Sequence, residues 1–144
     1  MKFVQQSYDE NDLVAKNVLI KVLTKHGWTI NSAEENYDHD VIAEKNGEVK
    51  YFEVEIKSQY KFTSDGTFPF PTVSFLGRKK RLHDKHPFLY VIISKQTGWA
   101  VCCESSVIFQ DQYIEKVKIN TRDRQGIDTM YRVPKGLCRH FNTN

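Results

Sequence analysis

Residues 37–42 (YDHDVI) and residues 51–57 (YFEVEIK) decide the fold of this chain. The dipeptide Asn46-Gly47 lies between these two β-prone stretches. An Asn-Gly pair in such a position is a strong signal for a hairpin with a two-residue turn. We therefore expect two adjacent antiparallel strands in the first half of the chain.

The second of these strands alternates charged and apolar residues. Because side chains alternate along a strand, Glu53, Glu55 and Lys57 are expected on one face and the apolar residues between them on the other. The hairpin brings Asp40 beside the charged face. Two carboxylates beside a lysine, with an apolar layer behind them, suit a divalent metal ion and an anionic substrate. The same pattern is also typical of an ordinary solvated face of an antiparallel hairpin.

Length and composition favour one domain without membrane segments. The chain has 144 residues, so we expect a single domain over residues 1–144 with its own core. Its net charge of +3 does not by itself indicate a nucleic-acid partner, and local clustering of charge must carry that argument. The apolar runs are too short to span a membrane, and three cysteines, two of them adjacent, form no disulfide framework. These features, with no signal-peptide core, predict an intracellular, cytoplasmic protein.

The pattern along the chain predicts helices and strands in mixed order. Asp9 and Glu10 crowd the expected start of the first helix, and Gly27 follows its expected end. The predicted elements are a helix over residues 9–26, strands over 28–30, 40–43 and 49–58, a short helix over 72–85, strands over 88–94 and 99–103, a helix or loop over 105–113, and a strand over 117–120. This order, α-β-β-β-(α)-β-β, predicts an α/β or α+β domain with a mixed central sheet.

Asp40 followed by Glu55-Ile56-Lys57 resembles the signature of the PD-(D/E)XK nuclease superfamily. That signature is an acid at the start of one hairpin strand and (Asp/Glu)-x-Lys on the next. The family's restriction-endonuclease-like core, α-β-β-β-α-β, matches the predicted order over residues 9–94, about two thirds of the chain. The chain departs from the family pattern at His39, which stands where the family name has proline.

The resemblance implies a metal-dependent endonuclease that hydrolyses DNA phosphodiester bonds. It assigns Asp40 and Glu55 to metal binding and to catalysis, and Lys57 to catalysis, where its charge orients the attacking water or stabilises the transition state. Glu10 matches a further metal ligand found in some members, and Gln59 a further catalytic residue found in others. Carboxylate oxygens suit Mg²⁺, which is the expected cofactor, with Mn²⁺ as its substitute.

A basic run follows the expected site in the sequence. We expect it to contact the phosphate backbone of DNA without reading the base sequence. A basic run is also typical of the solvated face of a helix. The residues concerned are Arg78, Lys79, Lys80, Arg81 and Lys85.

The sequence leaves open which acid of the first hairpin strand binds the metal, and which kind of DNA is cut. Asp38 lies on the same strand face as Asp40 and competes with it for the metal role, although Asp40 suits the family pattern better. Cleavage is either site-specific, as in a phage or homing enzyme, or directed at DNA junctions. The expected partner is DNA, and a homodimer or a higher symmetric oligomer is plausible for so small a protein.

A module without catalytic activity is the second hypothesis for this chain. It would keep the fold and the basic run, and it would bind nucleic acid or another protein. Asp40, Glu55 and Lys57 would then form a salt-bridge network in place of a catalytic site.

Overall fold

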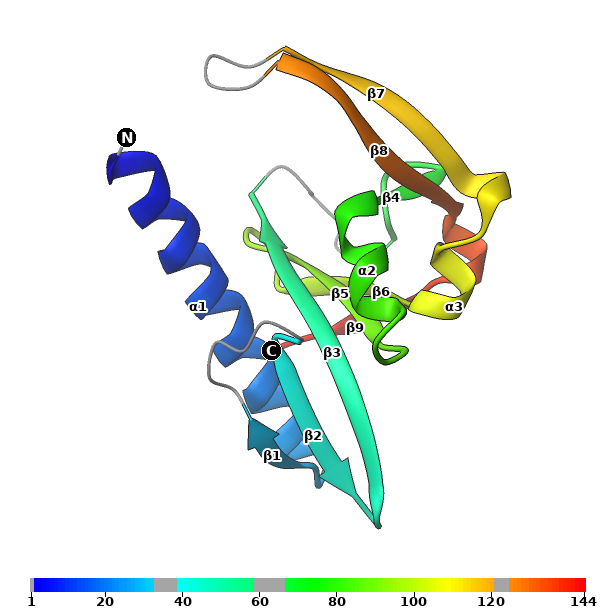
Figure 1. Cartoon of the computed structure of the whole chain (residues 1–144). Helices are drawn as coiled ribbons and strands as arrows, with labels where there is room; N and C mark the ends of the chain where they lie inside the picture. Colours follow the sequence, from blue (N-terminus) through cyan, green and yellow to red (C-terminus); the bar gives the residue numbers. More distant parts are fainter. Residues whose placement is uncertain (1, 33–38, 59–66, 121–124) are drawn as a thin grey trace.

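The computed structural model describes residues 2–32, 39–58, 67–120 and 125–144, and the side chains of 11–31, 39–58, 67–118 and 126–144. Figure 1 shows the whole chain. Its elements are, in chain order, α1 (Lys2–Lys25), β1 (Thr29–Ser32), β2 (Val41–Lys45), β3 (Glu48–Lys57), β4 (Thr72–Leu76), the 3-10 turn η1 (Gly77–Lys79), α2 (Lys80–His83), β5 (Leu89–Ser94), β6 (Trp99–Glu104), α3 (Ser105–Ile108), η2 (Asp111–Tyr113), β7 (Ile114–Asn120), β8 (Gln125–Pro134), η3 (Lys135–Leu137) and β9 (Arg139–Asn142).

The strands form two sheets, so the fold is α+β with a mixed central sheet. The larger sheet has six strands in the order β1-β2-β3-β5-β6-β9, and the smaller has three in the order β4-β8-β7. In the larger sheet β3 and β5 are parallel, and the other neighbouring pairs are antiparallel. The connection from β3 to β5 contains β4, η1 and α2. It therefore links the two sheets and carries the basic run between them.

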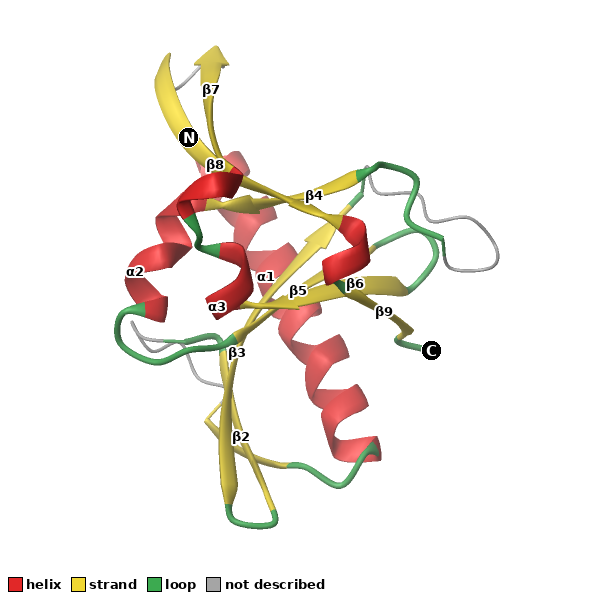
Figure 2. Cartoon of the chain, turned by 90° about the vertical axis from the view of Figure 1, so that its right-hand side faces the viewer, coloured by secondary structure: helices red, strands yellow, loops and turns green. Residues whose placement is uncertain are grey.

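The six-stranded sheet lies between two apolar layers. On one face, Leu19 and Leu23 of α1 pack with Phe52, Val54 and other sheet residues. The other face packs against the smaller sheet and the short helices, in a second cluster that includes Phe68, Val73, Phe75, Leu82, Tyr90, Ile92, Ile108, Tyr131 and Val133. Figure 2 shows α1 behind the large sheet and α2, α3 and β4 in front of it.

The expected hairpin is present in its expected register. Asn46 and Gly47 both have positive φ angles, 53° and 80°, as a two-residue turn between antiparallel strands requires. The strands pair from Lys45 with Glu48 out to Val41 with Phe52. This part of the fold therefore follows directly from local sequence.

Two predicted helices differ from the structure. The first helix begins at Lys2, so Asp9 and Glu10 lie within it and not at its start. The helix predicted over residues 72–85 is wrong in its first half, which is strand β4. There Val73 and Phe75 are buried with the two-residue period of a strand, and only Lys80–His83 forms an α-helix.

Gly77 is the point where β4 turns away from the smaller sheet, and it lies against the backbone of β8. A Cβ atom at this position would lie 2.5 Å from the carbonyl oxygen of Thr129. We expect Gly77→Ala to lower the free energy of unfolding by about 1–3 kcal/mol, because backbone must move to make room. Urea unfolding checks this, with Gly136→Ala as the control, since no heavy atom lies within 4 Å of a Cβ there. Equal losses in the two variants would contradict the prediction.

No helix in the described part of the chain has both the length and the apolar content needed to cross a membrane.

Candidate active site

The charged residues of β3 lie on the face that the smaller sheet and α2 cover, as the alternation predicted. Phe52, Val54 and Ile56 belong to the cluster around α1, on the opposite face. Glu53 is buried, with 1% of its surface exposed. A solvated strand face does not explain a buried carboxylate, because burying an unpaired charge costs several kcal/mol. Glu53 must therefore have partners within the protein.

Asp40 and Glu53 hold each other in place through the backbone. The backbone N–H of Asp40 donates a hydrogen bond to Oε2 of Glu53 over 2.7 Å. The backbone N–H of Val54 donates to Oδ2 of Asp40 over 3.1 Å. The two carboxylates thus meet at the point where β2 begins beside the middle of β3. The structure brings Asp40 to Glu53, whereas the sequence motif paired it with Glu55.

Lys79 enters this pair from η1. Its ammonium nitrogen lies 2.7 Å from Oε1 of Glu53, and 22% of its side chain is exposed. The charges of Asp40 and Glu55 also act on Lys79. One lysine therefore interacts with three carboxylates on β3 and at the start of β2.

Glu55 has its own partners further along β3. The hydroxyl group of Tyr90, on the parallel strand β5, donates a hydrogen bond to Oε1 of Glu55. The ammonium of Lys57 lies 3.5 Å from Oε2 of the same carboxylate. The Glu-x-Lys pair of the sequence motif is therefore in contact, with Lys57 toward the end of the strand.

The three carboxylates share one arrangement of partners. In each, a neutral N–H or O–H donor binds one oxygen, and the nearest ammonium group faces the other oxygen. Besides Lys57 and Lys79, a third lysine takes part. The ammonium of Lys16 in α1 lies 3.9 Å from Oδ1 of Asp40 and 3.3 Å from Oδ2 of Asp12. The sets are Val54 N–H and Lys16 on Asp40, Asp40 N–H and Lys79 on Glu53, and Tyr90 O–H and Lys57 on Glu55.

Crowding of these groups shifts their pKa values in opposite directions. Burial, and next the charge of Glu53, raise the pKa of Asp40 to about 6, against the opposing charge of Lys79. Burial would also raise the pKa of Glu53, but the contact with His39 and the charge of Lys79 outweigh it and lower that pKa. Burial would lower the pKa of Lys79, but the charges of Glu53 and Asp40 raise it. Asp40 is therefore the carboxyl group of this pair that takes up a proton first.

A pocket of about 400 Å³ opens beside these residues. Its size is that of a small-molecule or nucleotide site. The charged side chains in its wall come from three parts of the chain, namely Asp12 of α1, Glu55 and Lys57 of β3, and Arg78 and Lys79 of η1. Lys79 thus connects the pair Asp40–Glu53, which does not line the pocket, with the space where a substrate can bind.

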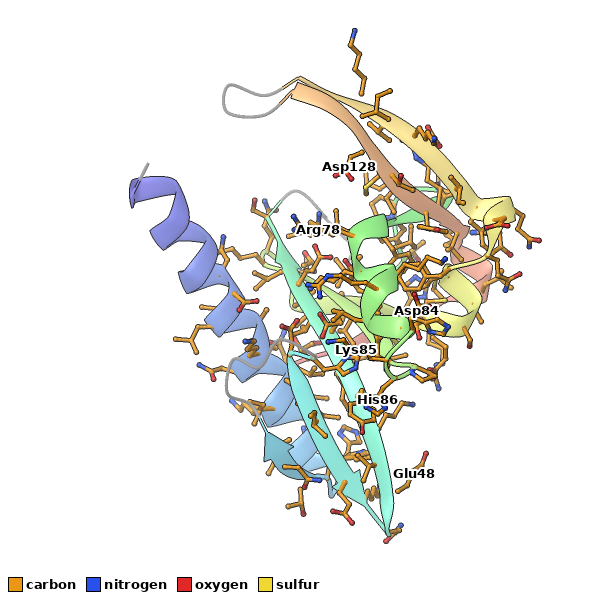
Figure 3. All side chains as sticks on the ribbon, in the orientation of Figure 1. Glu48, Arg78, Asp84, Lys85, His86 and Asp128 are labelled. Atoms are coloured by element: carbon orange, nitrogen blue, oxygen red, sulfur yellow. The ribbon has the colours of Figure 1, made fainter. Side chains whose placement is uncertain are left out.

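The basic run follows β3 from the pocket toward the hairpin. Lys79 contacts Glu53, and the ring of His86 stacks on Tyr51, earlier in the same strand, with centroids 4.3 Å apart. Figure 3 shows Arg78 beside the upper part of β3 and Lys85 and His86 further down. Four of the five predicted DNA-contacting residues are exposed, namely Arg78, Lys80, Arg81 and Lys85. The fifth, Lys79, is half-buried in its ion pair with Glu53.

Some predicted site residues cannot be compared with the structure. Glu10 lies in α1, but its side chain is not among those described, and Asp38 and Gln59 lie outside the described residues. Lys16 and Tyr90 belong to the site but were not predicted from the sequence. The place of Lys16 beside Ala15, on the side of α1 that packs on the sheet, is shown by the structure alone.

The oxygen atoms of these carboxylates are ligands that suit a magnesium ion. Among the described residues, no group of three or more His, Cys, Asp and Glu side chains is arranged to hold a metal ion. Mg²⁺ is commonly bound by only one or two carboxylates, with water and substrate phosphate as the other ligands. Asp40, Glu53 and Glu55 offer hard oxygen atoms of this kind, although ammonium groups now face the oxygens that the neutral donors leave open.

Comparisons with protein-family models, with curated proteins and with solved structures found no match to this chain.

Proposed function

We propose that this protein is a metal-dependent endonuclease that hydrolyses DNA phosphodiester bonds on a restriction-endonuclease-like core. The observation that carries the proposal is the meeting of one buried and two half-buried carboxylates with lysines beside a pocket flanked by a basic segment. Asp40 and Glu53 are fixed by backbone N–H groups, and Glu55 and Lys57 line the pocket beside them. Ordinary ion pairs of a protein surface are exposed and contribute little to stability, so the burial of Glu53 and Lys16 within this set suggests a functional reason.

The carboxylates and Lys57 would have different roles in catalysis. Asp40 and Glu55 would hold Mg²⁺ or Mn²⁺, together with Glu53, which the sequence offered as a candidate of second rank. When bound, the ion would supply Lewis-acid stabilisation of the charge on the phosphate and lower the pKa of a bound water. Lys57 lies in the pocket wall with its ammonium 3.5 Å from Glu55, where it would orient the attacking water and stabilise negative charge.

The basic segment would hold the DNA. Arg78 is exposed and lines the pocket, and the exposed residues Lys80, Arg81 and Lys85 follow it in the chain. Phosphate contacts of this kind fix the position of a duplex without reading its sequence. A homodimer would place two such sites on one duplex and is part of the proposal, as is an intracellular location.

Lys57→Ala is expected to lose metal-dependent DNA cleavage by about 10²-fold or more while keeping DNA binding, because it removes charge stabilisation at the site alone. The assay incubates parent and variant with supercoiled plasmid, linear DNA and four-way junctions in Mg²⁺, Mn²⁺ or EDTA. Lys95→Ala, an exposed lysine in the turn after β5, is the matched control. The nuclease proposal fails if the parent cuts none of these substrates, or if Lys57→Ala cuts as well as the parent.

A non-catalytic nucleic-acid-binding module is the second candidate. The observation that favours it is the lysine found opposite each carboxylate, which makes a salt-bridge network in the absence of metal. Such a module would bind DNA through the basic segment and ignore Mg²⁺. Binding of every DNA substrate without cutting, in parent and Lys57→Ala alike, is the result that this candidate requires.

A further inference from the structure

We propose that Lys79 is an internal counter-ion of the carboxylate site, and that it must leave Glu53 before a divalent cation binds there. This inference rests on the proposed function, because it concerns how the same site takes up its metal. It assigns Lys79 a second role, since the released ammonium becomes free to contact the phosphate of the substrate. Metal uptake and phosphate binding would then be coupled through one side chain.

Both carboxylate oxygens of Glu53 already have a close partner. Oε2 accepts the hydrogen bond from the backbone N–H of Asp40 at 2.7 Å, so it is held by the fold itself. Oε1 is the oxygen that remains, and Lys79 lies 2.7 Å from it. A metal ion that binds Glu53 through its second oxygen must therefore take the place of the ammonium of Lys79.

One carboxylate oxygen of Glu53 cannot hold an ammonium group and a divalent ion together. The charges of Glu53, Asp40 and Glu55 all act on Lys79, and its ammonium lies 2.7 Å from Oε1 of Glu53. Glu53 is buried, and charges at such a site repel or attract with little screening by water. A divalent ion and an ammonium group on the same carboxylate oxygen would repel each other strongly.

The pocket offers Lys79 a second position. Lys79 ends the short turn η1, and its side chain both pairs with Glu53 and lines the pocket. The long, flexible side chain of lysine can turn from Glu53 into the pocket without movement of the backbone. There it joins Arg78, which lines the same pocket, and two positive groups would then face the phosphate of a bound strand.

The test measures Mn²⁺ binding to the full-length protein by isothermal titration calorimetry at pH 7.5, without DNA. Lys79→Met removes the competing charge, so we expect it to bind Mn²⁺ at least about tenfold more tightly than the parent. Lys80→Met is the control, since it removes the same charge from the exposed neighbouring position and should leave the affinity for Mn²⁺ close to that of the parent. An unchanged or weaker affinity in Lys79→Met would overturn the proposal.

A second measurement uses the unmodified protein, in case Lys79→Met folds poorly. Acetylation of lysines by an amine-reactive reagent is followed by mass spectrometry with and without Mn²⁺. Release of Lys79 from Glu53 should increase its acetylation rate severalfold relative to Lys80. If saturating Mn²⁺ leaves the rate at Lys79 unchanged, or if Mn²⁺ binds neither protein, the counter-ion role is wrong.

The outcomes separate this inference from the nuclease proposal. Tighter Mn²⁺ binding by Lys79→Met, with no DNA cleavage by the parent, would support the counter-ion role of Lys79 and contradict the nuclease proposal. Metal-dependent cleavage by the parent, with equal Mn²⁺ affinities in parent and variant, would do the reverse.

Discussion

Asp40→Asn is expected to abolish DNA cleavage and, at the same time, to make the folded protein more stable at neutral pH. The loss of cleavage follows from the proposed role of Asp40 as a metal ligand, and we expect it to reach at least about 10³-fold. An asparagine keeps the oxygen that accepts the hydrogen bond from the N–H of Val54. The local backbone therefore has no reason to change.

The gain in stability follows from the raised pKa of Asp40. Burial and the charge of Glu53 raise this pKa from 3.8 to about 6 in the folded state, so the fold disfavours the ionised carboxylate. Above pH 6 the full cost of ionisation is present in the folded protein, and below pH 4 it is absent because the group is protonated in both states. Asparagine removes this cost, which we put at about 1–2 kcal/mol at pH 7.5 because the group is 17% exposed and has Lys79 nearby.

Urea unfolding at pH 7.5 and at pH 4 measures this effect. The advantage of Asp40→Asn over the parent should be present at pH 7.5 and nearly vanish at pH 4. Asp84→Asn, at an exposed aspartate after α2, is the control and should change stability by less than about 0.5 kcal/mol. A variant that is less stable than the parent at pH 7.5 would show that the carboxylate of Asp40 stabilises the fold.

Glu53→Met is expected to have the largest effect on stability of any change at this site. It leaves the half-buried ammonium of Lys79 without its nearest partner and the N–H of Asp40 without its acceptor. Removal of one member of a buried ion pair typically costs about 3–5 kcal/mol, because the other charge remains unpaired. We expect a loss of that size in the free energy of unfolding, measured by urea denaturation at pH 7.5.

The double variant Glu53→Met with Lys79→Met separates the ion pair from the packing around it. With both charges gone, the unpaired ammonium no longer contributes, so the double variant should lose less stability than the sum of the single variants. We expect a coupling energy of about 1–3 kcal/mol. Additive losses would mean that Glu53 and Lys79 act independently, despite the 2.7 Å between their charged atoms.

The hairpin and its two faces were predictable because their causes are local. Asn46-Gly47 specifies the turn, and the alternation of β3 specifies which residues face α1. The same turn also fixes the register, since counting outward from the pair Lys45–Glu48 places Asp40 opposite Glu53. The sequence therefore contained the signal for Glu53, although the resemblance to a known motif directed attention to Glu55.

The partner of Glu53 was not predictable, because its cause is not local. Arg78, Lys79, Lys80 and Arg81 are four basic residues in a row, and nothing in their order distinguishes the one that turns inward. That depends on β4, which pairs with a strand more than fifty residues later, and on the close approach of Gly77 to Thr129. The helix predicted over residues 72–85 failed for the same reason, since the strand partner of residues 72–76 lies far away in the sequence.

The pairing of β4 with β8 also sets the order in which the acidic and basic parts of the site are assembled during folding. The hairpin β2–β3 closes over a two-residue turn, and such hairpins form within microseconds. Strand β4, which precedes Lys79, forms only when Val73 pairs with Val133 of β8. This pairing requires a long loop to close and is correspondingly slow. We therefore expect Asp40 and Glu53 to meet early in folding, and Lys79 to reach them only after β4 has paired with β8 in the last third of the chain.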